Sequence, residues 1–198
     1  MGLEISEEKS ALRDARYGFK FLGFKITLVR KPTVGNYKVK IQPSVEKQKS
    51  LLQKVKKIVR HNKAVSSYDL IQMLRPVIIG WANYYKYCEC KKNLSTLTDK
   101  IFRKIRAWVF RRDTRNGRRF IKEKYFPSGK EYYFDGSVHK DNWILVGRKK
   151  LKGDKIGENF LPHIVWVKSL KHVKVRGDES PFSKSFYWTT RSAKYSPY

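Results

Sequence analysis

The sequence predicts an α+β fold in three parts: an N-terminal β-hairpin, a central three-helix bundle, and a small, irregular, basic C-terminal appendage that contains β-structure. Three observations support this prediction. Bulky residues alternate before residue 43, amphipathic helical stretches follow one another over residues 44–126, and helical periodicity is lost after Pro127. We therefore expect the segments 1–43, 44–126 and 127–198 to be distinct units.

The N-terminal segment is expected to hold a surface turn and a short helix over residues 1–16, followed by a β-hairpin. The first strand is expected to carry the alternating bulky residues Phe19, Phe21, Phe24, Ile26 and Leu28. Turn-forming residues at 31–36 separate it from a second alternation at Tyr37, Val39 and Ile41. Pro43 then ends the second strand.

The first predicted helix covers Val45–His61, where one face is apolar and the other is rich in lysine. Ser44 precedes it and is suited to be its N-cap. A second helix is expected to begin near Ser67, because Ser66 and Asp69 have the spacing of a capping box.

The second helix runs into Leu70–Lys92, the stretch around which the rest of the chain is organised. Its apolar residues recur at steps of three and four, as in an amphipathic helix. Proline inside a helix costs about 3 kcal/mol, so the chain is expected either to bend at Pro76 or to begin a new helix there. Asn93 is expected to cap a third helix, whose apolar face includes Trp108.

Beyond Pro127, aromatic and apolar residues predict a short sheet or hairpin around Asp135-Gly136. Residues 147–160 are rich in glycine and lysine, and we expect them to form a loop. Leu161–Tyr198 lacks clear periodicity and is expected to be irregular.

The charge of the chain indicates a polyanionic partner. There are 45 Lys and Arg residues against 17 Asp and Glu, a net charge of +28. Such an excess repels itself in a compact protein unless a polyanion neutralises it. Nucleic acid is the expected partner. A membrane surface is the weaker alternative, because the cations are interleaved with aromatic residues throughout and no apolar run approaches the roughly 20 residues of a membrane span.

The most cationic stretch is Ile101–Lys124, where arginine outnumbers lysine seven to three. Guanidinium groups bind phosphates with two hydrogen bonds and stack on bases, which ammonium groups cannot do. This favours a nucleic-acid surface over a merely solvated helix face.

The sequence does not indicate catalytic chemistry. Metal-dependent phosphoryl transfer needs two or more converging carboxylates, and the acidic residues here are scattered, with Glu7-Glu8 and Asp178-Glu179 adjacent. Cys88 and Cys90 lack a second pair, and the histidines are far apart, so we expect no metal, cofactor or catalytic residue. The two cysteines also favour a reducing, intracellular compartment. We expect a binding protein, not an enzyme.

The candidate RNA-binding residues are mostly the cations that flank and follow the second helix. They are Arg60, Lys63, Lys86, Lys91, Lys92, Arg103, Arg106, Arg111, Arg112, Arg115, Arg118, Arg119, Lys122, Lys124 and the aromatic Tyr85. Residues expected to serve mainly in packing are Gly80, Trp81, Asn83, Tyr84 and Trp108. Trp81 is expected to be buried, Tyr85 at least partly exposed, and Gly80 to provide a packing notch.

One family resemblance accounts for these features together. A leucine-rich helix leading into Gly80–Tyr85, GWANYY, resembles the maturase-specific segment, domain X, of group II intron-encoded proteins. Phe21–Phe24, FLGF, is similar to the element that ends the reverse-transcriptase palm of that family, and Gly2-Leu3 with Glu7-Glu8-Lys9 is similar to the stretch before it. Downstream, Trp108 and Lys124–Phe126 are similar to the end of domain X.

The resemblance extends to the C-terminus and has departures. His172–Pro181 with Tyr187-Trp188 resembles a segment that leads, in many members, into an HNH-type nuclease domain. Arg75-Pro76 stands where many members have Asn-Pro. The YxDD motif of the polymerase would lie before Met1 and the nuclease region beyond Tyr198, so neither is expected to act in this chain.

The resemblance implies that residues 1–43 derive from the palm, 44–126 form the thumb or domain X, and 127–198 form a nucleic-acid-binding appendage. It implies binding of group II intron RNA and assistance to splicing by stabilising the folded RNA, without catalysis by the protein. DNA, through the appendage, and a separately encoded reverse-transcriptase part are further candidate partners. Two alternatives stay open: a general RNA- or DNA-binding remnant, and one half of a split reverse transcriptase. The expected location is the plastid stroma, with bacterial cytoplasm as the alternative.

Overall fold

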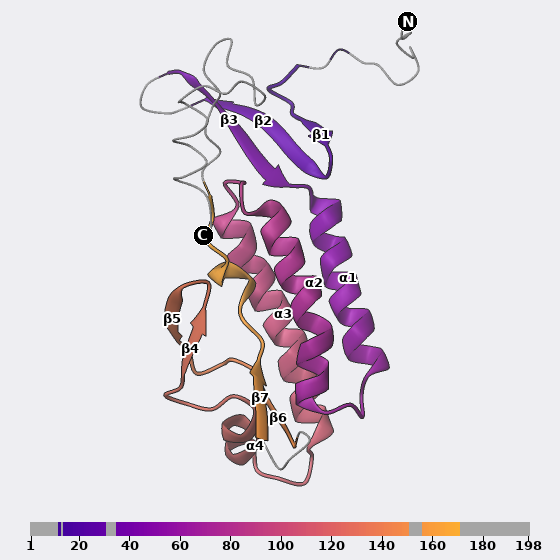
Figure 1. Cartoon of the computed structure of the whole chain (residues 1–198). Helices are drawn as coiled ribbons and strands as arrows, with labels where there is room; N and C mark the ends of the chain where they lie inside the picture. Colours follow the sequence, from indigo (N-terminus) through magenta and orange to yellow (C-terminus); the bar gives the residue numbers. More distant parts are fainter. Residues whose placement is uncertain (1–11, 13, 31–34, 151–155, 171–198) are drawn as a thin grey trace, which may run out of the picture.

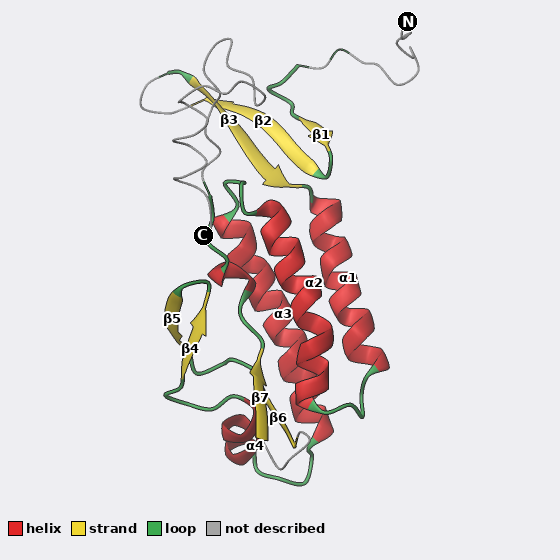
Figure 2. Ribbon diagram, in the orientation of Figure 1, coloured by secondary structure: helices red, strands yellow, loops and turns green. Residues whose placement is uncertain are grey.

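Three long helices form the centre of the structure (Figure 1), which is a computed structural model that describes residues 12, 14–30, 35–150 and 156–170. They are α1 (Val45–His61), α2 (Ser67–Tyr85) and α3 (Lys91–Arg112). A three-stranded sheet lies at the end of the bundle where α1 begins, and smaller elements cover one side of it (Figure 2). The mixed α+β fold is as predicted.

The first two helices begin where their caps predict. The Ser44 hydroxyl accepts a hydrogen bond from the backbone N–H of Lys47 (3.4 Å), and that of Ser66 accepts one from Asp69 (3.1 Å). Between them, these caps fix the starts of α1 and α2. The second helix continues through Pro76 as one helix, so no new helix begins there.

The prediction that Asn93 caps the third helix is wrong. That helix begins at Lys91, and Cys90 holds the N-cap position without a side-chain hydrogen bond to the helix N-terminus. The first helical bond runs from the Leu94 N–H to the Cys90 carbonyl (2.8 Å). Because Cys88 and Cys90 are buried in the core, packing, and not a polar cap, determines where the chain enters α3.

The predicted N-terminal hairpin is a three-stranded antiparallel sheet, β1 (Phe19–Phe21), β2 (Phe24–Arg30) and β3 (Tyr37–Pro43). The stretch expected to be one strand is split at Leu22-Gly23, where both residues have positive φ (46° and 83°). Two such residues in succession suit a tight hairpin turn, and glycine adopts this conformation readily. The alternation changes phase at this turn, because the step from Phe21 to Phe24 is three residues and not two, and that shift marks the break.

Residues 113–150 form elements that cover one side of the bundle. The short helix α4 (Arg118–Tyr125) was not predicted as a separate element. It is followed by β4 (Glu131–Phe134) and β5 (Ser137–Lys140). The predicted turn at Asp135-Gly136 joins these two strands, with φ of 51° and 68°.

The predicted loop over residues 147–160 is wrong. Strands β6 (Val146–Lys150) and β7 (Ile156–Phe160) pair antiparallel there. The hairpin packs on α2: a Cβ on Gly147 would lie 2.3 Å from the Tyr68 backbone nitrogen, so only glycine permits this approach. The two strands contain few bulky residues, which is why the segment resembles a loop in composition. Contacts with α2, and not bulky cross-strand pairs, stabilise them.

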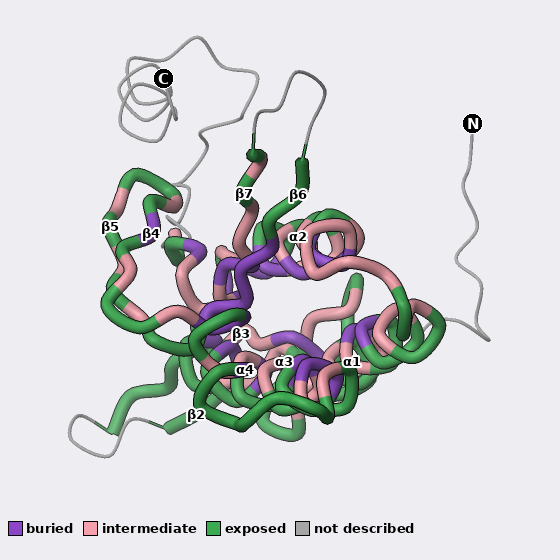
Figure 3. Tube along the Cα trace, turned by 90° about the horizontal axis from the view of Figure 1, so that it is seen from below, coloured by how far each residue is buried: buried purple, intermediate pink, exposed green. Residues whose placement is uncertain are grey.

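One main core joins the central helices to the C-terminal segment. It contains residues of all three long helices and also Leu145, Leu161, Ile164 and Val167. Figure 3 shows these buried positions where the helices face one another and along the chain that enters β6. A smaller core contains Tyr132, Ile144 and Val146. The division of the chain at residue 126 stays a prediction, but the part of 127–198 that the structure describes is packed on the bundle.

The C-terminal segment ends, as far as it is described, with the short 3₁₀ turn η2 (Ile164–Trp166). The motif residues Gly2-Leu3, Glu7-Glu8-Lys9, His172–Pro181 and Tyr187-Trp188 lie outside the described residues, as does most of the predicted N-terminal helix. No helix in the described ranges is both long and apolar enough to span a bilayer.

Candidate nucleic-acid interface

Cationic side chains line two neighbouring grooves at the end of the bundle where α1 and α3 end. The α1–α3 groove is lined by Arg60, Lys63, Lys104, Trp108, Arg111 and Arg112. The α3–α4 groove is lined by Arg103, Arg106, Phe110 and Arg118. Ala107 lines both grooves, so its small side chain is the low ridge between them. We call the two grooves together the basic face.

The helical period of α3 produces the basic face. Its apolar residues recur at steps of three and four and are buried: Leu94, Leu97, Ile101, Ile105, Trp108 and Val109. The remaining positions turn outward, which places Arg103, Ala107 and Arg111 one turn apart on the exposed side. The buried stripe that holds the bundle together therefore also aligns the arginines.

Few acidic residues neutralise this face. Arg103 pairs with Asp99 one turn earlier in α3 (3.0 Å), in an exposed ion pair. No acidic residue among those described lines either groove. Arg106 lies over the ring of Phe110 (5.6 Å to its centroid). The surface therefore presents several arginines with flat aromatic neighbours, the combination that binds phosphates and stacks on bases.

Arg112 differs from its neighbours because it fastens the bundle. Its guanidinium donates to the carbonyls of Lys63 (3.4 Å) and Val65, and lies over the ring of Trp108 (5.1 Å). The Trp108 indole N–H in turn donates to the Asn62 carbonyl (3.0 Å). These contacts hold the α1–α2 connection against α3, so both side chains act first in packing, as expected for Trp108.

The cations of α4 are partly engaged within the protein. Lys124 pairs with Asp113 (3.6 Å), and Lys122 pairs with Glu123 (2.9 Å) and lies over the ring of Trp143. Hydrogen bonds from Ser128, and then from Lys122, lower the pKa of Glu123 to about 2. Arg118 and Arg119 are exposed, as is Arg115 just before the helix. The arginines therefore offer more free charge than the two lysines.

Three predicted RNA-binding lysines lie elsewhere. Lys91 and Lys92 are exposed at the start of α3, about 30 Å along the helix from Arg111 at 1.5 Å per residue. Lys86 is half-buried at the end of α2, where its carbonyl accepts from the Leu170 N–H (2.9 Å). Most of the predicted RNA-binding residues therefore lie together where α1 and α3 end, whereas Lys86, Lys91 and Lys92 lie at the other end of the bundle.

The GWANYY stretch fastens the three-stranded sheet to the bundle. The Tyr84 hydroxyl donates to the Leu22 carbonyl (2.9 Å), and the Tyr85 hydroxyl donates to the Gly23 carbonyl (3.3 Å). The ring of Phe24 stacks on Tyr84 and meets Tyr85 edge-on, with centroids 5.3 and 5.0 Å apart. The FLGF turn and the GWANYY helix end are therefore bound to each other.

The expected burial of two aromatic residues in this stretch is reversed. Tyr85 is 3% exposed, and burial raises its pKa to about 12, whereas Trp81 is only partly buried against the core. Tyr85 is thus a core residue and not an RNA contact. It lies one helical turn after Trp81, with ring centroids 4.3 Å apart, and the sheet covers it. Asn83 and Tyr84 are exposed.

The prediction that Gly80 is a packing notch is also wrong. Apart from its chain neighbours and the backbone of its own helix, no described residue lies within 4 Å of a Cβ built on Gly80, and Gly80 is exposed. It borders a third groove, between α1 and α2, lined by Lys47, Lys54 and Trp81 among others. Sequence reasoning did not single out Lys47, Lys54, Lys104 or Phe110. The available signal was a seven-residue spacing, which keeps two residues on one helix face: Lys47 and Lys54 have it in α1, and Lys104 and Arg111 have it in α3.

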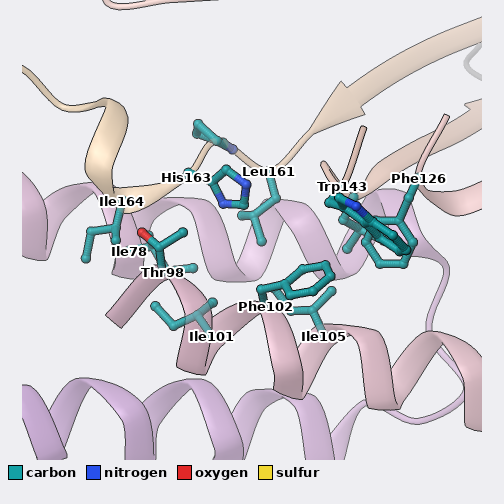
Figure 4. Close-up of a pocket in the computed structure, with 12 residues that line it drawn as sticks. Ile78, Thr98, Ile101, Phe102, Ile105, Phe126, Trp143, Leu161, His163 and Ile164 are labelled. Carbon is teal, nitrogen blue, oxygen red and sulfur yellow. The ribbon is translucent and has the colours of Figure 1, made fainter. Parts of the chain in front are cut away.

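One enclosed cavity among the described residues is small and apolar. A cavity of about 20 Å³ lies between α2, α3 and the C-terminal segment, lined mainly by residues such as Ile78, Phe102 and Leu161 (Figure 4). That is room for about one water molecule, not for a ligand. Burial lowers the pKa of His163 at its edge, although Asp141, 3.3 Å away, partly opposes this. In the described residues, no three His, Cys, Asp or Glu side chains gather as a metal site would require.

Comparison with known proteins identifies one region. Residues 48–126 match a family model described as the group II intron, maturase-specific domain. The match begins early in α1 and ends at Phe126, directly after α4, so it contains every residue of the basic face. No curated protein matches the chain.

Proposed function

Because residues 48–126 form a group II intron maturase-specific domain, we propose that the chain binds group II intron RNA through the basic face and assists splicing by stabilising the folded RNA. The observation that carries this proposal is the continuity of two arginine-lined grooves across Ala107. Folded RNA packs phosphates closely, and each cation that contacts one releases counterions, which favours binding.

The protein's part in splicing is binding without catalysis. Its carboxylates are scattered along the sequence, and those near the basic face, Asp99 and Asp113, are each engaged with a nearby cation. In this proposal the RNA supplies the reacting groups, and the protein lowers the Mg²⁺ concentration at which the RNA holds its active fold. The proposed location is the plastid stroma, with bacterial cytoplasm as the alternative. The genomic position of the reading frame tests this.

A separately encoded reverse-transcriptase part is a proposed second partner. The edge strand β1 and its turn expose Phe19, Phe21 and Leu22, the last to 68%. Exposed apolar side chains on an edge strand are typical of a surface that another polypeptide covers. Co-purification with such a part, abolished by Phe21→Ser, is the expected result. Unchanged co-purification of that variant would remove β1 from the interface.

The basic face is tested by a triple variant, Arg106→Gln, Arg111→Gln and Arg118→Gln. These arginines are exposed, and none forms an ion pair with a described residue. The variant should bind a candidate intron at least about tenfold more weakly. The slope of its affinity against salt concentration should be shallower by about one unit for each phosphate that the protein no longer neutralises.

The matched control replaces Lys25, Arg30 and Lys40 on the sheet with glutamine. These substitutions at exposed residues remove the same charge at a distance from the basic face. An equal loss of intron affinity in both triple variants would mean that net charge alone binds the RNA. No loss in the arginine variant would place the RNA surface elsewhere.

A further inference from the structure

The groove between α1 and α2 has features that the basic face does not account for. Lys47, Ser50 and Lys54 line it from α1, and Gly80, Trp81 and Tyr84 line it from α2. The β1–β2 turn closes one end through Leu22. In Figure 1 these two helices run side by side beneath the sheet, so the groove lies away from α4.

Gly80 is the first of these features. Glycine in a helix interior costs about 0.5–1 kcal/mol relative to alanine. The usual reason to keep it there is a neighbour that a Cβ would strike, but apart from its chain neighbours and the backbone of its own helix no described atom lies within 4 Å of that position. The described part of the fold therefore gains nothing from glycine here. The other physical reason for glycine is the close approach of a ligand to the backbone.

Aromatic surface is the second feature. Tyr84 is 52% exposed even though one face of its ring stacks on Phe24. Its hydroxyl bond to the Leu22 carbonyl holds the ring in place. Trp81, one turn from Tyr85 and next to Gly80, is only partly buried. Two fixed aromatic rings thus border a stretch of open helix backbone.

The charge of the groove indicates the chemistry of its occupant. Lys47 and Lys54 are exposed on the opposite wall, and neither forms an ion pair with a described residue. No acidic residue in the described ranges lines the groove. Cations along one wall and stacking surfaces on the other are the arrangement that binds single-stranded nucleic acid. A double helix has no free base faces to offer, and it is too wide to enter between two packed helices.

We propose that the α1–α2 groove binds an unpaired stretch of RNA, with one or two bases stacked against Trp81 and Tyr84 over Gly80 and with phosphates beside Lys47 and Lys54. This rests on the proposed RNA-binding function. It adds to the basic face a second site that accepts only unpaired nucleotides. The two sites together would select RNA in which a helix and an unpaired strand lie next to each other.

The experiment fills the groove without disturbing the fold. Gly80→Gln adds a long, uncharged, helix-favouring side chain where the structure has open space. Asn83→Gln is the control, because Asn83 is exposed on the same helix but does not line the groove. Fluorescence anisotropy of a short labelled oligouridylate measures binding, and circular dichroism confirms that each variant is folded.

The expected result is a loss of about tenfold or more in oligouridylate affinity for Gly80→Gln, with Asn83→Gln unchanged. Lys54→Glu, which alters only an exposed side chain, should show a similar loss. Binding of a perfect RNA duplex should be unaffected in both. Oligouridylate affinity equal to that of the wild type in Gly80→Gln, or no binding by the wild type, overturns the proposal.

Other occupants predict different results. If polyglutamate competes with the oligouridylate as effectively as unlabelled oligouridylate does, charge alone explains binding and the proposal fails. It also fails if the wild type dimerises through the groove and Gly80→Gln abolishes the dimer. If Gly80→Gln behaves as the wild type while the basic-face triple variant loses the intron, this inference fails and the proposed function stands. If Gly80→Gln loses oligouridylate binding while the basic-face triple variant binds the intron as well as the wild type does, the groove is supported and the basic face is not the RNA-binding surface.

Discussion

At the scale of single residues, neighbours in the sequence have different roles because the helical period turns them to different surroundings. Tyr84 is exposed and Tyr85 is buried, yet both donate to carbonyls of the same turn. Arg111 borders an open groove, whereas Arg112 is bound to the α1–α2 connection. Residue type alone does not separate these roles.

Arg112 and Arg111 form a matched pair for mutation. Arg112→Ala removes hydrogen bonds to two backbone carbonyls and the interaction with Trp108. It should lower the free energy of unfolding by about 1 kcal/mol, because these exposed bonds are only modestly stabilising. Arg111→Ala should change it by less than about 0.5 kcal/mol and weaken RNA binding instead. Urea unfolding measures the difference, and equal stability losses would show that Arg112 does not fasten the loop.

At the scale of elements, the features that could be predicted from the sequence are those decided by residues close together in the chain. The caps at Ser44 and Ser66 and the turn at Asp135-Gly136 were predictable because side chains or glycine within a few residues decide them. The buried stripe of α3 was predictable from its period. These signals need no knowledge of the rest of the molecule.

Elements that depend on distant contacts were missed. The start of α3 follows from burial of Cys88 and Cys90, not from Asn93. The β6–β7 hairpin depends on α2: Lys149 pairs with Asp69 (2.8 Å), and Arg75 donates to Asn159 (3.1 Å) and lies over Phe160. Likewise, the burial of Tyr85 and the openness of Gly80 depend on the sheet and on α1. These contacts join residues that are far apart along the chain, and a single sequence does not show which distant residues meet.

Gly147 tests the packing of that hairpin. Gly147→Ala would place a Cβ 2.3 Å from the Tyr68 backbone nitrogen, so β6 must move away from α2. The expected cost is about 1–3 kcal/mol in the free energy of unfolding. Gly80→Ala, at an open helix position, is the control and should stabilise by about 0.5–1 kcal/mol. If both substitutions changed the free energy of unfolding in the same direction, β6 would not approach α2 as closely as described.

At the scale of the whole molecule, the C-terminal segment and the helices share a core, so folding of one depends on the other. Leu161, Ile164 and Val167 pack with the helices, and His163 lies between them at the same surface. The proposed RNA-binding surfaces are therefore held by a framework that extends beyond residues 48–126, the region that matches the family model. Truncation after Phe126 would expose that core.

His163 makes this junction sensitive to pH. Burial lowers its pKa below the ordinary value of 6.5; Asp141 opposes the shift, and His139 adds to it. The unfolded chain therefore takes up a proton before the folded protein does. The part of the stability that depends on neutral His163 is fully present above about pH 6.5 and is lost as the pH falls below that value. His163→Gln should flatten this part of the stability curve.

The control for this pH effect is His61→Gln, at the exposed end of α1. Thermal unfolding between about pH 7.5 and 5 compares the three proteins, because a histidine with an ordinary pKa titrates in this range. The wild type and His61→Gln should lose stability in parallel, and His163→Gln should lose less. A parallel loss in all three would show that His163 is not held in its neutral form.

Splicing of a candidate group II intron at a Mg²⁺ concentration too low for the RNA alone tests the proposed function of the basic face. The wild-type chain should accelerate splicing. The variant with Arg106, Arg111 and Arg118 changed to glutamine should lose most of that acceleration, and the variant with Lys25, Arg30 and Lys40 changed should keep it. Full acceleration by the arginine variant, or none by the wild type with any candidate intron, would contradict the account.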